Sequence, residues 1–198
     1  MTHIPKRCWN TENPLYIKYH DEEWGVPVHD DQKLFELLTL EGFQAGLTWE
    51  LILKRRDALK KAFAGFDPKI IANYKKTDVD IILRNPNVIR NKAKVNAAVS
   101  NAQRFIEVQK EFGSFDKFIW QFVNGKTIDH SLKSMSDMQS ETSESQVMSN
   151  ELKRCGFKFV GPVICYAFMQ AVGMVNDHLT FCFRYKEIQK SNLQQVHE

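Results

Sequence analysis

The chain has no long apolar run, no apolar leader and few cysteines. None of its stretches approaches the roughly 20 consecutive apolar residues of a membrane-spanning helix, so we expect no membrane association. Residues 1–7 lack the apolar segment of a signal peptide. The four cysteines among 198 residues do not suggest a disulfide framework. These absences predict a protein of the reducing cytoplasm.

Strand signals and internal repeats are also scarce. The composition, 43% hydrophobic and 26% charged, is that of a globular protein, so disorder is not expected. A chain of 198 residues can bury a substantial core and suits a single domain over residues 1–198. The net charge of +3 is compatible with a nucleic-acid partner without demonstrating one.

Basic residues gather in three clusters along the chain. Such clusters could follow a phosphate backbone, and the alternative is that they are solvated helix faces, which charge alone favours. The clusters are Lys54, Arg55, Arg56, Lys60 and Lys61, then Arg90, Lys92 and Lys94, and then Lys153, Arg154 and Lys158.

Helical periodicity dominates the chain and predicts an all-α fold. Residues 125–145 lose the apolar pattern and are expected to form a surface connection, and residues 183–198 a polar, frayed tail. Thr77 to Asp80 and Ser143 to Gln146 resemble capping boxes. Helices are predicted from Pro14 past His20, from Asp30 or Asp31 to Ala45, from Trp49 to Phe63, after Asp67-Pro68, from Asn91 to Phe112, from Ser114 to Val123, from Ser143 to Arg154 and from Val160 to Val172.

Each end of the chain carries one histidine and one cysteine. Cys8 and His20 lie near the start, and His178 and Cys182, four residues apart, lie near the end. Zn²⁺ commonly takes two cysteines and two histidines in a tetrahedron. If the four donors meet, the metal joins the two ends of the chain. Spacing alone leaves open that they are unrelated core or surface residues, because no compact zinc-finger pattern is matched.

Glu41 breaks the apolar stripe of the second predicted helix. Leu34, Leu37 and Leu38 precede it and Ala45 follows at helical spacing, so a carboxylate stands where the core pattern requires an apolar residue. A buried carboxylate needs a partner or serves a site. The alternative is that the helix turns Glu41 towards solvent near its end.

Aromatic residues are expected near this carboxylate. Trp49 begins the next predicted helix, and Tyr16 and Tyr19 share a helix face with His20. Such rings beside a carboxylate suit a flat, hydrogen-bonding ligand that can be cationic, although each ring taken alone could be an ordinary core residue.

A glycine-bounded turn joins two predicted helices at residues 156–162. Its backbone N–H groups and the following helix N-terminus could meet a phosphate. The turn lacks the Lys-Ser/Thr pair of a P-loop, so we expect no nucleotide cofactor.

Several segments together resemble the bacterial 3-methyladenine DNA glycosylase I family. The resemblance covers about residues 7–182 and implies a helix-hairpin-helix glycosylase fold. It also implies a monomeric enzyme of base excision repair, which hydrolyses the N-glycosidic bond of 3-methyladenine in alkylated double-stranded DNA and leaves an abasic site. The matching segments are Cys8-Trp9, Pro14 to Asp21, Glu22 to Pro27, Glu41 to Trp49, Gly156 to Gly161 and Val175 to His178.

The resemblance also implies roles for individual residues. Glu41 matches the carboxylate that recognises the base, Trp49 would stack on the purine, Tyr16 and Tyr19 would line the pocket, and Trp9 and Trp24 would close its walls. Lys158, Phe159, Val160 and Gly161 would grip the DNA backbone. One structural zinc ion would be held by Cys8, His20, His178 and Cys182.

One segment departs from many helix-hairpin-helix glycosylases. Those enzymes have Val-Asp-Thr-His where this chain has Val175, Asn176, Asp177 and His178, and the amide is shared with the 3-methyladenine family. Val163 stands where bifunctional relatives have a Schiff-base lysine, so a monofunctional enzyme using water is expected. The role of Asp177 stays open.

The same residues allow two other functions. A zinc-bound protein could recognise DNA damage without excising it, although the complete pocket set argues against this. Zinc could instead be the catalytic Lewis acid, but four protein ligands leave no open coordination position.

Overall fold

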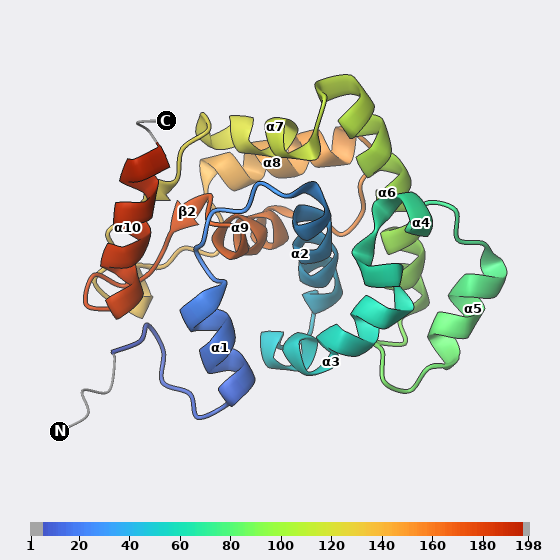
Figure 1. Cartoon of the computed structure of the whole chain (residues 1–198), viewed down its shortest axis with the longest axis horizontal. Coiled ribbons are helices and arrows are strands. Elements are labelled where there is room, and N and C mark those ends of the chain that lie inside the picture. Colours follow the sequence, from blue (N-terminus) through green and yellow to red (C-terminus); the bar gives the residue numbers. More distant parts are fainter. Residues whose placement is uncertain (1–5, 196–198) are drawn as a thin grey trace.

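The computed structural model describes residues 6–195, with side chains for residues 6–190, and is mostly helical (Figure 1). The prediction that the chain starts without a signal peptide falls mainly on residues 1–5, outside the described part. The α-helices are α1 Pro14–Glu22, α2 Asp31–Gln44, α3 Trp49–Ala62, α4 Pro68–Ile71, α5 Lys76–Arg84, α6 Lys92–Phe112, α7 Phe115–Trp120, α8 Ser143–Arg154, α9 Pro162–Ala171 and α10 Phe183–Gln195. Short 3₁₀ helices are η1 Ala64–Phe66, η2 Gln121–Val123 and η3 Met135–Asp137.

Side-chain caps fix most of the helix starts that the sequence predicts. Asn13, Asp30, Thr48 and Asp67 each accept a hydrogen bond from a first-turn N–H group of the helix that follows. Two predicted caps are wrong. The helix near Thr77 starts earlier, because Asp78 accepts from the Lys75 N–H, and α8 is capped by Thr142 instead of Ser143.

The structure is mostly helical, as predicted, and adds one small parallel sheet. β1, Ile128–Asp129, pairs with β2, Val175–Asn176, through hydrogen bonds such as Ile128 N–H to Met174 O at 3.0 Å. β1 lies in the stretch that was expected to be only a surface connection. The pairing of two residues on each strand is too short to produce an alternating sequence pattern.

The predicted frayed tail is also wrong for its described part, because residues 183–195 form α10. Tyr185 and Ile188, three residues apart on one helix face, are buried. Tyr185 donates from its hydroxyl to Asp129 and Gln189 donates to the same carboxylate, which ties α10 to β1. Residues 196–198 lie outside the described part.

Helix α2 runs through the centre of the molecule, with α9 on one side and α6 on the other (Figure 1). Every residue from 34 to 41 is buried, so α2 has no solvent face over this stretch. The buried apolar side chains form one continuous core that extends from Cys8 to Cys182. Within the described residues, no helix is long and apolar enough to cross a membrane.

Candidate base-binding site and metal centre

Helix α1, the segments on either side of it and the start of α3 carry the predicted aromatic residues. The ring centroids of Tyr19 and Trp49 lie 5.1 Å apart, and those of Trp9 and Tyr16 lie 5.4 Å apart. Trp9 also meets Trp24 edge-on at 4.7 Å. Thr48 caps α3 and so places Trp49 on its first turn. The five aromatic residues therefore form two contacting groups along the inner side of α1.

Glu41 is buried, with only 3% of its surface exposed. The alternative that α2 turns it to solvent is therefore wrong, because α2 is enclosed on every side at this depth. Burial raises the pKa of Glu41 to about 8, since the charged form loses its hydration. Burial and then the Glu41 charge raise the pKa of both Tyr16 and Tyr19.

Three atoms of this region lack the partners that buried polar groups normally have. Among the described residues, the buried side-chain atoms without a hydrogen-bond partner are Glu41 Oε2, Trp49 Nε1, Trp9 Nε1 and Arg184 Nε. Leaving such groups unpaired costs about 1–3 kcal/mol each, and native proteins contain few of them. Three of the four belong to the predicted base pocket, so one acceptor and two donors there are available to a ligand.

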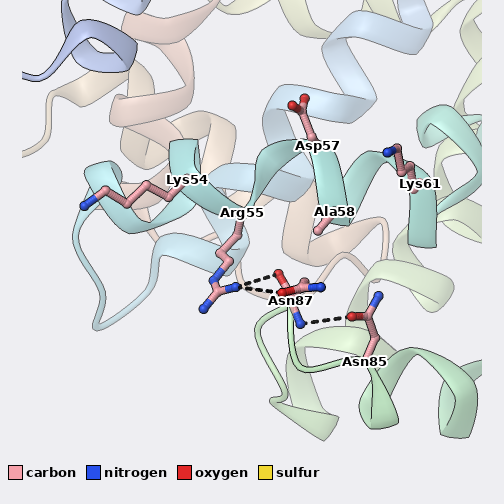
Figure 2. A pocket seen from close by; sticks show the side chains of 7 residues that line it. All are labelled: Lys54, Arg55, Asp57, Ala58, Lys61, Asn85 and Asn87. Atoms are coloured by element: carbon pink, nitrogen blue, oxygen red, sulfur yellow. Dashed lines mark hydrogen bonds between the residues drawn. The ribbon is translucent and has the colours of Figure 1, made fainter.

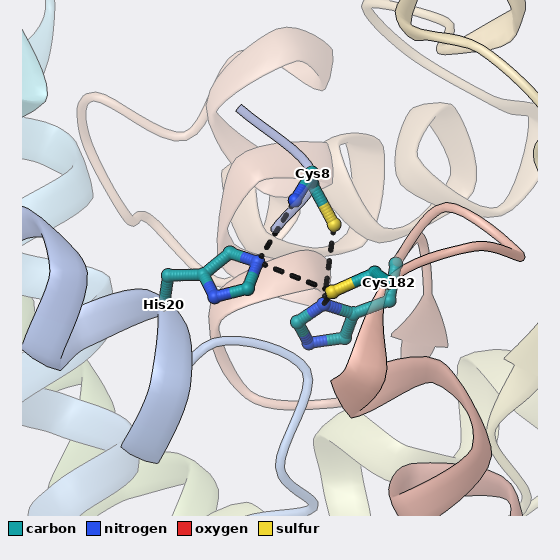
Figure 3. Close-up of side chains that lie close together, drawn as sticks. Cys8, His20 and Cys182 are labelled. Carbon is teal, nitrogen blue, oxygen red and sulfur yellow. Dashed lines mark hydrogen bonds between the residues drawn. The ribbon is translucent and has the colours of Figure 1, made fainter. Parts of the chain in front are cut away.

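The four predicted metal ligands meet at one point beside this pocket. Their ligand atoms all lie within 4.8 Å of one another, and all four residues are buried. Cys8 Sγ lies 3.3 Å from His178 Nδ1, and Cys182 Sγ lies 3.6 Å from both His20 Nε2 and His178 Nδ1 (Figure 3). Zinc bonds of about 2.3 Å to sulfur and 2.0–2.1 Å to nitrogen give tetrahedral edges of about 3.5 Å. These three distances are close to such edges, and the four donors together could hold a metal ion.

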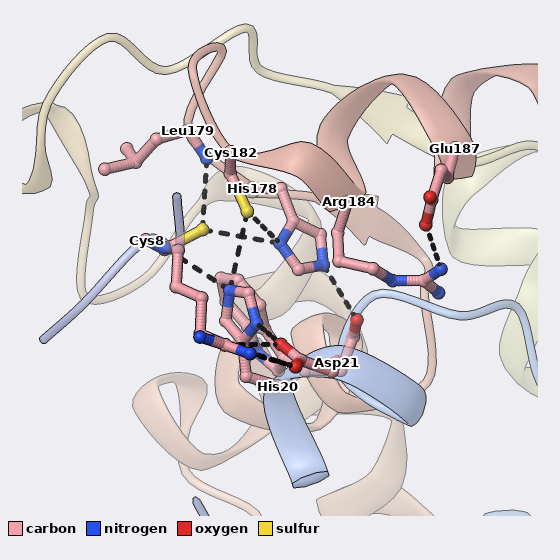
Figure 4. Close-up of polar contacts among 10 residues, drawn as sticks. Cys8, His20, Asp21, His178, Leu179, Cys182, Arg184 and Glu187 are labelled. Atoms are coloured by element: carbon pink, nitrogen blue, oxygen red, sulfur yellow. Dashed lines mark hydrogen bonds and ion pairs between the residues drawn. The ribbon is translucent and has the colours of Figure 1, made fainter. Parts of the chain in front are cut away.

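The second nitrogen of each histidine is fixed by the protein. His20 Nδ1 lies 2.7 Å from Asp21 Oδ1, and His178 Nε2 donates to the Trp24 carbonyl at 2.9 Å (Figure 4). Arg7 holds Asp21 through contacts of 2.7–3.1 Å. Such outer contacts set which nitrogen faces the metal. Asp21 was not among the predicted site residues, although a carboxylate directly after a ligand histidine could have indicated it.

The turn between α8 and α9 is held on the core by its backbone. Asn101 of α6 bonds both the N–H and the carbonyl of Lys158 at 2.8 and 2.9 Å. Lys158 itself is exposed and Phe159 is half-buried. Val160 is buried, with 2% of its surface exposed, so its side chain does not reach the surface. Of the residues predicted to contact DNA here, Val160 can take part only through its backbone.

Two residues of the basic clusters bond to groups inside the protein instead of lying free at its surface. Arg56 bonds Glu36 at 2.8 Å and Glu23 through two contacts of 2.8 Å, which ties α3 to α2 and to the end of α1. Lys94 donates to two backbone carbonyls and is 6% exposed.

Three residues of the first cluster, Lys54, Arg55 and Lys61, border a surface hollow of about 350 Å³ between α3 and the turn after α5 (Figure 2). Its charged lining residues are Lys54, Arg55, Asp57 and Lys61, and none of its lining residues belongs to the predicted base pocket.

Asn176 and Asp177 have structural partners. Asn176 accepts from the His178 N–H and approaches the Tyr185 carbonyl. Asp177 is 1% exposed and is bonded by His130, Tyr166 and Gln170 at 2.5–2.7 Å. These bonds hold the segment that carries His178 against β1 and α9.

Comparison with known proteins gives one consistent result. A family model described as methyladenine glycosylase matches residues 9–185. The DNA-3-methyladenine glycosylase of Haemophilus influenzae is 45% identical over 177 residues, which cover 89% of this chain and 96% of that protein. A crystal structure of a 3-methyladenine DNA glycosylase I matches with a TM-score of 0.88 at 45% identity, covering 90% of this chain and 98% of the other.

A second structure comes from work on 3-methyladenine recognition by the Staphylococcus aureus enzyme. It has a TM-score of 0.87 at 38% identity, covering 89% of this chain and 94% of the other. The resemblance inferred from the sequence motifs is thereby confirmed. By family-model match and by sequence identity over most of its length, this chain is a member of the methyladenine glycosylase family.

Proposed function

We propose that this protein hydrolyses the N-glycosidic bond of 3-methyladenine in alkylated double-stranded DNA, and that Glu41 and its aromatic neighbours receive the base. The observation that carries the site assignment is that Glu41 Oε2, Trp49 Nε1 and Trp9 Nε1 are buried without a hydrogen-bond partner. A purine offers an amino donor, ring-nitrogen acceptors and a flat face, which match these three atoms and the rings around them.

The positive charge of the methylated base explains why a carboxylate would stand in the pocket. Methylation at N3 makes the base cationic, so it is already a good leaving group and needs little help from a general acid. An opposite charge in the pocket favours ionised Glu41 and offsets the burial that raises its pKa. Unmodified adenine brings no charge and leaves poorly, so the same pocket discriminates against it. As the bond from the sugar carbon to the base breaks, its electron pair neutralises the purine, which leaves with its amino group bonded to Glu41. Water then adds to the cationic sugar carbon and releases a proton to solvent.

Each aromatic residue has a place in this scheme. Trp49 stacks on the purine, with Tyr19 5.1 Å behind it. Tyr16 lines the pocket, and Trp9 and Trp24 close the wall that faces the metal cluster. The base reaches them only after leaving the helical stack, because a stacked base cannot enter an enclosed site.

The turn between α8 and α9 is proposed to bind the DNA backbone as the hairpin of a helix-hairpin-helix fold. Lys158 is exposed at its tip, and Gly161 precedes α9 without a side-chain cap, so the first-turn N–H groups of α9 are open to a phosphate. The exposed Val163 stands where a Schiff-base lysine would be needed, which supports a glycosylase without a lyase step. The enzyme is proposed to act as a monomer in the cytoplasm.

The metal is proposed to be one structural Zn²⁺. The two thiols and two imidazoles are the donor set that this ion commonly takes, and their spacing suits a tetrahedron. With four protein ligands, the ion has no position for water or DNA, so its contribution is to fix the walls that carry Trp9, Tyr19 and Trp24.

The test is release of free 3-methyladenine from methylated duplex DNA, measured chromatographically for the wild type, Glu41→Gln and Glu50→Gln. Glu50 is the matched control, because it is an exposed carboxylate on the first turn of α3. We expect Glu41→Gln to lower kcat by about 100-fold or more, the range of electrostatic contributions in active sites, and Glu50→Gln to have little effect. Binding of methylated DNA by the wild type without release would instead favour a damage-recognition protein.

A further inference from the structure

Helix α6 carries two buried polar side chains on one face. Lys94 and Asn101 are seven residues apart, which is close to two helical turns, so both point the same way. Only 6% of Lys94 and 8% of Asn101 is exposed. Burying a lysine or an amide is unfavourable unless its polar atoms are hydrogen-bonded. The hydrogen-bond partners of these two side chains therefore show which segments this helix face holds in place.

Lys94 holds the end of α2. Its Nζ donates to the carbonyl of Phe43 at 2.8 Å and to that of Ala45 at 2.6 Å. The last carbonyls of a helix have no partner within the helix and carry its negative dipole end, so an ammonium group is well suited to them. Ala45 follows α2 directly, and the turn of residues 45–48 leads from the Glu41 helix into Trp49.

Asn101 holds the turn between α8 and α9. Its Oδ1 accepts from the Lys158 N–H at 2.8 Å and its Nδ2 donates to the Lys158 carbonyl at 2.9 Å. Both backbone polar groups of one residue are therefore bound by a single amide. The next residue, Phe159, has a φ of 55°, in the left-handed region that non-glycine residues seldom adopt. The two bonds of Asn101 help to maintain this local backbone.

The two held segments also touch each other. A Cβ placed on Gly42 would lie 3.4 Å from Phe159 Cβ and 3.6 Å from the Phe159 carbonyl oxygen, so the turn packs directly on the backbone of α2. Gly42 is the residue after Glu41. A narrow crevice lined by Gly42, Lys94, Asn101 and Phe159, among others, marks this junction.

We propose that Lys94 and Asn101 are positioning residues that set the base pocket and the DNA-gripping turn at a fixed separation on α6. The proposal rests on the function proposed above, since it concerns a nucleotide whose phosphate lies on the turn while its base lies at Glu41. The four hydrogen bonds of these two side chains hold, from one helix, the two segments that would receive the base and the phosphate of that nucleotide. A misplacement of about 1 Å between binding and reacting groups can cost about 100-fold in rate.

The proposal predicts a division between the two residues. Lys94→Met removes the bonds to the α2 end and should weaken binding of free 3-methyladenine by about tenfold, leaving affinity for a duplex with a tetrahydrofuran abasic analogue within about twofold. Asn101→Ala should weaken binding of the duplex by about tenfold and leave binding of the free base nearly unchanged. Both should lower kcat on methylated DNA by more than either binding constant changes.

Two controls lie on the same helix. Lys92→Met removes an equal charge from an exposed position two residues away from Lys94. Gln103→Ala breaks the bond from an exposed side-chain amide to the Ala72 carbonyl, which ties α6 to the end of α4, away from the site. Neither should alter binding of the free base, and Gln103→Ala should not alter duplex binding.

The measurements are tryptophan fluorescence titrations for the free base and fluorescence anisotropy for the duplex, at a temperature at which thermal melting shows every variant folded. If Lys94→Met does not fold, Lys94→Gln, which keeps a donor without the charge, replaces it. Equal losses of both affinities in both variants, or losses matched by the controls, would overturn the proposal. Absence of 3-methyladenine binding and release in the wild type would refute the proposed function, and the duplex affinities of Asn101→Ala and Gln103→Ala would still decide whether the turn is positioned from α6.

Discussion

Cys8 Sγ lies 3.3 Å from His178 Nδ1, although 170 residues separate the two in the chain. This contact joins the segment before α1 to the segment after β2. Tyr16 and Tyr19 of the proposed base pocket lie on α1, so their position depends on this closure. A hydrogen bond from Cys8 and further contacts with His178 and His20 lower the pKa of Cys182, and a thiolate is the form that binds a metal.

Cys182→Ala should lower zinc content and thermal stability together, because binding of a structural metal is coupled to folding. We expect a decrease in Tm of about 10 °C, which corresponds to a few kcal/mol for a chain of this size. Zinc per protein would be measured by atomic absorption and Tm by calorimetry. Cys165→Ala is the control, since Cys165 is equally buried but outside the cluster. An unchanged Tm and zinc content in Cys182→Ala would contradict the closure.

Asp21→Asn should weaken zinc binding while leaving the four ligands in place. The neutral amide loses the ion pair with Arg7 and is a weaker acceptor for His20 Nδ1. Changes to such outer partners typically cost 10–100-fold in metal affinity. Competition with a chromogenic chelator measures this. Glu22→Gln, an exposed carboxylate on the next position of α1 that pairs with Lys18, serves as control and should bind zinc as the wild type does.

The sequence predicted the helices well because their starts are set by local caps such as Asn13 and Asp30. It could not predict β1, because two residues on each strand produce no pattern and the pairing joins residues 47 positions apart. Glu41 was found because it interrupts an apolar stripe.

Lys94 and Asn101 were not found as site-supporting residues. Lys94 was grouped with the surface charges, because its sequence neighbours Arg90 and Lys92 are basic and its partners are backbone carbonyls 49 and 51 residues away. A side chain that bonds a distant backbone leaves no mark on the sequence around it. The proposed metal ligands have a recognisable chemistry, whereas the one signal for their outer partner Asp21 is its position directly after His20.

Lys158→Ala should weaken DNA binding without regard to the lesion. Lys158 is exposed on the turn and its backbone, rather than its side chain, is held by Asn101. The plot of log binding constant against log salt concentration has a negative slope, and loss of one phosphate contact should reduce its steepness by about 1. Anisotropy titrations at several salt concentrations, with methylated and unmethylated duplexes, measure this. Lys153→Ala, on the last turn of α8, tests whether any nearby charge has the same effect. A loss confined to methylated DNA would argue against a phosphate contact.

Glu41 makes the stability of the free protein depend on pH in a defined direction. Burial raises its pKa in the folded state to about 8, above the unfolded value of 4.5. The folded state therefore binds this proton more tightly, and the stabilisation present below pH 4.5 is lost as the pH rises through about 8. Glu41→Gln has no such loss. Between pH 4.5 and 8, the free energy of unfolding of the variant should therefore rise relative to that of the wild type by on the order of 1–3 kcal/mol.

Ionisation of Glu41 should lower the stability of the free protein but raise its activity. A cationic base is held by ionised Glu41, so kcat/KM of the wild type on methylated DNA should rise between about pH 6 and 8, and that of Glu41→Gln should stay flat and low. Urea unfolding and single-turnover excision across this range measure the two effects. Glu50→Gln, changed at an exposed carboxylate, should follow the wild type in both. A stability difference between wild type and Glu41→Gln that did not change with pH would mean that Glu41 is not a buried acid in solution, and its assignment as the acceptor for a charged base would fail with it.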